Sequence, residues 1–210
     1  MKKIHYLLMV IFLLIFSSIT FADSFQNGSF ETGPSPGVFV TLSAGDTSIT
    51  GWTVTQGSID YIGSYWAASA GSRSIDLNGL YQQGGIEQSF GTTSGQKYIV
   101  SFDLAGNFDT GGVDPKKMTV DVALFSGSYS FSKPISWSHT TMGWATYDFE
   151  FTAQADSSTL RFISETGPTN DAWGPALDNV RVTSVPEPGI LILLGISMMS
   201  VAGLRKWWKE

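Results

Sequence analysis

Apolar and polar side chains alternate, one by one, along much of the middle of this 210-residue chain. The clearest run covers residues 98–104, and shorter runs with the same period lie at 118–124, 147–151, 160–162 and 180–182. A β-strand points successive side chains to opposite faces, whereas an amphipathic helix repeats about every 3.6 residues. Turn-forming pairs such as Asn78-Gly79 and Gly84-Gly85 separate the runs. We therefore expect an all-β chain folded as a single jelly-roll β-sandwich.

The first 22 residues have the three parts of a secretory signal peptide. Lys2 and Lys3 are basic, residues 7–16 are apolar without interruption, and small or polar residues follow as far as Ala22. A membrane anchor is the alternative, but a helix needs about 20 apolar residues to cross a bilayer. We expect residues 1–22 to be removed by cleavage after Ala22.

The last segment, residues 185–210, differs in character from the alternating part. It opens with Pro186, Glu187 and Pro188, continues as an apolar run over 189–204, and ends in basic residues and two tryptophans. The apolar run is only marginally long enough to span a membrane. Because basic residues stay on the cytoplasmic side, the preceding chain would lie outside.

The segment between these ends, residues 23–184, has the length of one domain. It holds 7 Lys and Arg against 16 Asp and Glu, so its formal net charge is 7 − 16 = −9. Such a domain is a poor partner for nucleic acid, because neutralising phosphates requires Lys and Arg. Calcium ions and neutral sugars are more suitable partners. The chain has no cysteine, so its stability must come from the core.

The tail resembles a PEP-CTERM sorting signal, because Pro186-Glu187-Pro188, the apolar run and the basic end occur in that order after an exported domain. The resemblance implies an exosortase-type processing enzyme as a partner, in a Gram-negative bacterium that makes extracellular polysaccharide. It implies a temporary anchor in the inner membrane. The domain would then be transferred to the cell surface or released.

The domain is similar to the choice-of-anchor C family, which is related to plant cell-wall domains of unknown function. The resemblance runs through residues 27–31, 49–54, 57–62, 71–79, 102–107 and 174–180. It implies a galactose-binding-like jelly roll at residues 23–184, and it supplies no catalytic residue.

Candidate catalytic groups are few. His139 is the only histidine of the domain, and without a nucleophile-elbow pattern around it we expect a surface residue. Asp109 begins an Asp-Thr-Gly triplet, which we interpret as a solvated turn. Asp148 and Glu150 share a strand face, as a glycosidase pair would, but a solvated face explains them as well.

Calcium binding rests on two acids. Calcium takes several oxygen ligands, and Asp178 has the same strand parity as Val180 and Val182, which predicts a carboxylate directed toward the core. A buried carboxylate must be paired or metal-bound. The galactose-binding-like resemblance implies a structural calcium ion between an early acid and a late Asp, here Glu31 and Asp178. Two ordinary turn acids are the alternative.

Aromatic residues in turn-rich stretches suggest a carbohydrate site, because aromatic rings fit the apolar faces of sugars. The candidates are Tyr65, Trp66, Tyr81 and Trp173. Packing beneath loops is the alternative for both tryptophans. Arg73 either pairs with Asp60 or Asp76, or lines the same cleft.

These patterns predict a non-enzymatic, exported β-sandwich that binds polysaccharide. A purely structural surface protein without a glycan site is the second possibility, and a carbohydrate-active hydrolase is the third.

Overall fold

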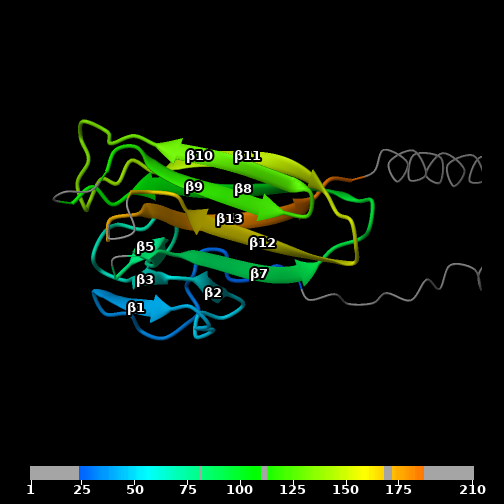
Figure 1. Ribbon diagram of the computed structural model, residues 1–210, viewed down its shortest axis with the longest axis horizontal. Helices are drawn as coiled ribbons and strands as arrows, with labels where there is room; N and C mark the ends of the chain where they lie inside the picture. Colours follow the sequence, from blue (N-terminus) through cyan, green and yellow to red (C-terminus); the bar gives the residue numbers. More distant parts are fainter. Residues whose placement is uncertain (1–23, 81, 110–112, 168–171, 187–210) are drawn as a thin grey trace, which may run out of the picture.

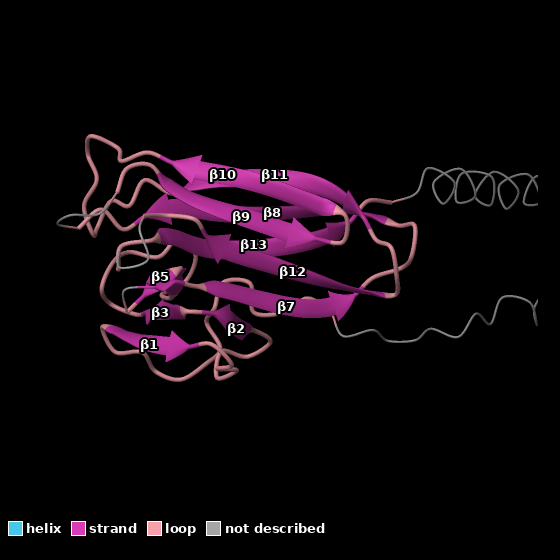
Figure 2. Cartoon of the chain, viewed as in Figure 1, coloured by secondary structure: helices cyan, strands magenta, loops and turns pink. Residues whose placement is uncertain are grey.

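The computed structural model describes residues 24–80, 82–109, 113–167 and 172–186, and in this part of the chain every regular element is a β-strand (Figures 1 and 2). One sheet has six strands in the order β1 (Phe39–Ser43), β3 (Ser58–Ile62), β4 (Ser74–Asp76), β13 (Pro175–Ser184), β8 (Lys97–Gly106) and β11 (Ala145–Thr152). A second sheet has five, in the order β10 (Phe125–Phe131), β9 (Lys116–Val122), β12 (Ser157–Ser164), β7 (Gly85–Gly91) and β2 (Thr53–Gln56). A small hairpin joins β5 (Asn78–Gly79) to β6 (Gln82–Gln83). The expected all-β sandwich is confirmed.

The core lies between the two larger sheets, and the alternation of the sequence builds it. Val100, Phe102 and Leu104 of β8 are fully buried, and so are Val120 of β9 and Phe162 of β12. The rings of Phe102 and Phe162, one from each sheet, meet edge to face with centroids 5.4 Å apart. Ring pairs of this geometry add to the free energy of burial.

The outer face of the six-stranded sheet carries the other half of each alternating run. Asp103 of β8 lies opposite Asp178 of β13, while the preceding pair, Leu104 and Leu177, lies in the core. Directly paired residues share a face, so Asp178 is on the outer face. The prediction that it points to the core is wrong, because a bulge between Asp178 and Arg181 shifts the register. Asn179 lies within this bulge at a φ of 54°.

Several sequence predictions fall outside the described residues. They are the signal peptide, Tyr81, and the tail from Glu187 onward, including Pro188; Pro186 is the last residue described. Where the chain is described, no helix has the length and apolar character needed to span a bilayer.

Candidate functional site

A long loop, residues 63–73, links β3 to β4 and covers the outer face of the six-stranded sheet. Asp178 fixes its middle, because one carboxylate oxygen accepts hydrogen bonds from the backbone N–H groups of Ser69 and Ala70, both at 2.8 Å. Glu31 fixes its end, accepting from the N–H groups of Ser72 and Arg73, also at 2.8 Å. The 63–73 loop is therefore held by one carboxylate from each end of the domain.

Asp103 lies beside Asp178 under the 63–73 loop. Its carboxylate accepts hydrogen bonds from the hydroxyls of Ser69 and Thr146 and from the amide of Asn179. Burial alone would raise the pKa of Asp103, but these three donors hold it below its usual value. Asp178 is fully buried, and burial outweighs its backbone hydrogen bonds, raising its pKa to about 7.

A calcium ion shared by Glu31 and Asp178 stays a prediction. Calcium needs about six to eight oxygen ligands, whereas these carboxylates face backbone N–H groups at different points of the loop. Among the described residues, no group of three or more His, Cys, Asp or Glu side chains is arranged to hold a metal ion. Both acids hold the loop in place through these hydrogen bonds, which agrees with the alternative of two ordinary acids.

A strip of partly exposed rings crosses the outer face beside the 63–73 loop. Its members are Phe39 of β1, Tyr65 of the loop, and His139 and Trp137 of the connection between β10 and β11. The ring centroids of successive members lie 5.4, 4.6 and 5.5 Å apart. We call these four residues the aromatic strip.

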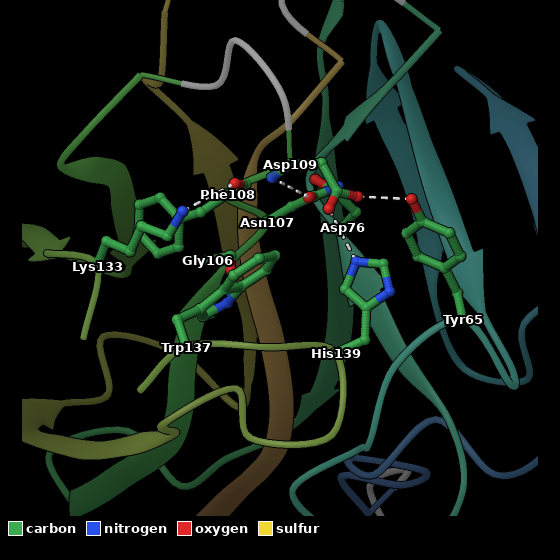
Figure 3. A network of polar contacts seen from close by, with 9 residues as sticks. All are labelled: Tyr65, Asp76, Gly106, Asn107, Phe108, Asp109, Lys133, Trp137 and His139. Atoms are coloured by element: carbon green, nitrogen blue, oxygen red, sulfur yellow. Dashed lines mark hydrogen bonds and ion pairs between the residues drawn. The ribbon is translucent and has the colours of Figure 1, made fainter. Parts of the chain in front are cut away.

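Asp109 joins the centre of the aromatic strip. The Tyr65 hydroxyl donates to one of its oxygens at 2.5 Å, and Nε2 of His139 lies 2.9 Å from the other (Figure 3). The hydrogen bond to this carboxylate is the main cause that raises the pKa of Tyr65 to about 12. Both rings are thereby fixed to one carboxylate whose side chain is 24% exposed.

A buried layer supports Asp109 from below. Asn107 accepts a hydrogen bond from the N–H of Asp109 and donates to Asp76 at 2.9 Å. Asp76 also accepts from the N–H groups of Asn78 and Gly174. Burial raises the pKa of Asp76 to about 8, with Asp60 adding to the rise and Lys116 opposing it. A continuous chain of hydrogen bonds through Asn107 and Asp76 therefore holds Asp109 in place beneath the strip.

The far end of the strip is fixed by the backbone and by a cation. Trp137 donates from Nε1 to the carbonyl of Gly106 at 3.0 Å, and the Lys133 ammonium lies 4.8 Å from the centroid of its ring (Figure 3). A cation over the face of a Trp ring is attracted to it, so this contact adds to the hydrogen bond that positions the ring. The strip thus combines fixed rings with fixed polar groups.

The comparisons with known proteins place the domain in a family. A family model described as "Protein of unknown function (DUF642)" matches residues 23–183. The chain belongs to the DUF642 family. A second model, the PEP-CTERM protein-sorting motif, matches residues 184–206 and confirms the resemblance of the tail. This motif indicates a secreted protein that is sorted through a C-terminal signal. The narrower resemblance to the choice-of-anchor C family stays a prediction.

Individual relatives cover the same domain. The chain is 35% identical over 168 residues to Halomucin of Haloquadratum walsbyi, which covers 78% of this chain and 2% of Halomucin. A solved family 61 carbohydrate-binding module, in complex with β-1,4-galactotriose, shares 14% identity at a TM-score of 0.46, covering 78% of this chain and 99% of the module. A family 35 module from Clostridium thermocellum shares 17% identity at a TM-score of 0.46, covering 70% and 98%.

The predicted ligand residues of the DUF642 domain lie in different surroundings. Tyr65 is in the aromatic strip, but Trp66 is only 4% exposed and donates to the Ser74 hydroxyl at 2.8 Å. A sugar platform at Trp66 is therefore wrong, and packing beneath the loop describes it. Trp173 is half-buried and its carbonyl accepts a hydrogen bond from Lys116.

Arg73 forms no ion pair with Asp60 or Asp76. Its Nη1 donates to the Tyr61 hydroxyl at 2.7 Å and to the Gly33 carbonyl at 3.3 Å. Arg73 lines a separate pocket whose lining includes none of the predicted aromatic residues, so the cleft that the second alternative expected it to share with them is not seen among the described residues.

The sequence singled out His139 and Asp109 only as candidate catalytic groups and did not point to Phe39 or Trp137, so the aromatic strip was not predicted. His139 is a surface residue, as expected, with a side chain that is 37% exposed, and it also pairs with Asp109 across 30 positions of sequence. Asp148 and Glu150 are exposed, as a solvated face requires, and Glu150 pairs with Lys97 at 2.6 Å.

Proposed function

We propose that the DUF642 domain binds carbohydrate through the aromatic strip and performs no catalysis. The observation that carries this proposal is the fixed row of four rings beside the Asp109 carboxylate. Sugars present apolar C–H faces and polar hydroxyl edges, so a row of rings bordered by acceptors suits them. Because neighbouring contacts hold the rings, little side-chain entropy would be lost on binding.

The sorting motif supports a role outside the cell. In this proposal an exosortase-type enzyme of a Gram-negative bacterium removes the tail, and the domain reaches the cell surface or the surrounding matrix. The polysaccharide exported by the same cell is then the nearest ligand. The net charge of the domain, −9, favours neutral stretches of such a polymer over nucleic acid or other polyanions.

The His139–Asp109 pair is the observation that keeps a hydrolase under consideration. An acid that orients a histidine is one part of a catalytic triad. However, Tyr65 occupies the other carboxylate oxygen, and the neighbouring hydroxyls of Ser138 and Thr140 bond to each other. A positioned nucleophile is therefore missing among these described neighbours, and orientation of rings explains the pair.

Retardation in gels that contain polysaccharide tests the proposal. The panel consists of neutral galactan, xylan and β-glucan, together with the exopolysaccharide of the producing cell. We expect retardation by at least one polymer, weakened in a Phe39→Ala/His139→Ala variant of unchanged melting temperature. Absence of retardation by every polymer would contradict the proposal and favour a purely structural protein. Release of reducing sugar that depends on His139 would favour a hydrolase.

A further inference from the structure

A small pocket opens where β1 begins, β3 ends and β4 begins. Its volume is about 320 Å³, at the low end of the roughly 300–1,000 Å³ typical of ligand pockets. It is lined by Ser35, Pro36, Gly37, Gly63, Ser64, Ser72 and Arg73. Its walls therefore consist of three hydroxyls, the Pro36 ring, backbone and one cation.

Arg73 is the only charged side chain in this lining, and its guanidinium is held in place. The Nη1 group is fixed by Tyr61 and Gly33, and the guanidinium carbon lies 5.5 Å from the Tyr61 ring centroid. Nη2 and Nε make no hydrogen bond to any described residue. Of the three ion pairs between described residues, none involves Arg73. Glu31 contacts the Arg73 backbone N–H and forms no ion pair with the guanidinium.

Among the described residues, Arg73 shares the lack of an ion pair with Arg181, but of these two arginines it is Arg73 that lines the pocket. Exposed donors on a fixed guanidinium suit a carboxylate, which accepts two parallel N–H hydrogen bonds from it. Three serine hydroxyl oxygens on the pocket wall suit the hydroxyls of a sugar ring. Arginine, serine and pocket size together point to a small, singly charged, hydroxyl-rich ligand.

We infer that the Arg73 pocket binds one uronic acid residue at the end or branch of a glycan. A long polyuronate would be repelled by the charge of the domain, −9, whereas a single carboxylate can pair with Arg73, the one charged side chain of the lining, while the nearby Glu31 carboxylate is engaged by Ser72 and by the Arg73 N–H. The pocket is a neighbour of the aromatic strip, since Ser64 precedes Tyr65 and Gly37 lies two positions before Phe39. The inference rests on the proposed function in that the domain binds glycans, but it uses different residues.

Titration of the protein, followed by calorimetry, tests the inference. The probes are a disaccharide ending in glucuronate, its glucose-ended counterpart, inorganic phosphate, and the neutral polymers of the gel panel. We expect the acidic disaccharide to bind more tightly than the neutral one and phosphate to compete only weakly. Arg73→Gln should weaken the acidic disaccharide about tenfold or more, because it removes a charge-assisted pair. Arg73→Lys should recover only part of this affinity, because it keeps the charge and loses the planar donors.

A second variant guards against a folding defect, because Arg73 also contacts Tyr61. Ser35→Asp places a negative charge in the pocket without removing any of these contacts, and should abolish binding of the acidic disaccharide. Ser126→Asp, an exposed serine of β10 on the other sheet, is the matched control and should leave binding unchanged.

The outcomes separate the two proposals. Uronate binding that both pocket variants remove, with neutral polymers still bound, supports both. Neutral polymers bound without any preference for uronate, or uronate binding that both variants leave intact, would overturn the pocket alone. Phosphate binding as tightly as the acidic disaccharide would overturn the sugar assignment. Uronate binding at Arg73 without neutral-polymer binding would overturn the aromatic strip and leave the pocket standing.

Discussion

Phe39→Ala is the most direct test of the aromatic strip, because its ring is exposed at the end of the strip. Phe39 is 45% exposed, and the centroid of its ring lies 5.4 Å from that of the Tyr65 ring. About 45% of the ~200 Å² of an aromatic residue is roughly 90 Å², which at about 25 cal/mol per Å² is worth about 2 kcal/mol if fully covered by ligand. Half coverage gives about 1 kcal/mol.

These values predict that Phe39→Ala weakens polysaccharide binding roughly 5- to 30-fold, since about 1.4 kcal/mol is tenfold in affinity. Affinity electrophoresis at several polymer concentrations measures the dissociation constant. Leu124→Ala is the matched control, because Leu124 is 85% exposed in the turn between β9 and β10 and makes no contact with the strip. An unchanged dissociation constant for Phe39→Ala, with the melting temperature of the wild type, would refute the assignment of the strip.

Four further outcomes follow from the contacts under the strip. Asp178→Ala removes the acceptor of two loop N–H groups. Since each unpaired donor costs about 1–3 kcal/mol, we expect the free energy of unfolding, measured in urea, to fall by about 2–4 kcal/mol. Glycan binding should weaken as well. Burial raises the pKa of Asp76 from 3.8 to about 8 and that of Asp178 to about 7, so the folded state holds these protons more tightly than the unfolded chain. The stabilisation that these two carboxyls provide is fully present below pH ~4 and is lost as the pH rises toward 8, by up to about 1.4 kcal/mol per pH unit for each carboxyl. Higher urea midpoints at pH 8 than at pH 5 would contradict this expectation. Calcium should leave the melting temperature unchanged, because Glu31 and Asp178 are engaged by N–H groups. A bound calcium ion at 100 times its dissociation constant would instead raise the free energy of unfolding by about 2.7 kcal/mol, and a rise in melting temperature of that size would support the calcium site. Tyr65→Phe should cost about 1 kcal/mol in stability, measured by urea unfolding, and should retain most polymer affinity, because the ring stays while the hydrogen bond to Asp109 is lost; complete loss of binding would show that the hydroxyl contacts the ligand.

The sandwich was predictable because the alternation of apolar and polar residues within each strand shows which of its faces is buried. The alternation over 98–104 became β8, whose Val100, Phe102 and Leu104 are fully buried. The same rule failed at Asp178, because parity carries along a strand only while the register is regular. One bulge between Asp178 and Arg181 moves the carboxylate to the opposite face. A bulge leaves little mark on the local sequence, so Asn179 gave no warning.

The candidate site was less predictable, because it is assembled from contacts between distant segments. Tyr65 and Asp109 are 44 positions apart, and Asp109 and His139 are 30 apart. The search for aromatic residues in turn-rich stretches found Tyr65, but it could not tell that Tyr65 is partly exposed whereas Trp66 is buried. Neighbours in sequence, these two point to opposite environments, one to the outer face and the other to the core. Only the path of the 63–73 loop decides between them.

The position of β13 links this loop to the sorting tail. β13 carries Asp178 and ends at Ser184, where the match to the sorting motif begins. Pairing with the sheet continues one residue further, because the N–H of Val185 donates to the Lys97 carbonyl at 2.9 Å and Gln96 donates to the Val185 carbonyl. Cleavage before Val185 would remove these contacts from the strand that fixes the 63–73 loop. In the proposed processing, a cut after Val185, where Pro186 opens the motif, would keep these contacts and leave the strand that holds the 63–73 loop unchanged.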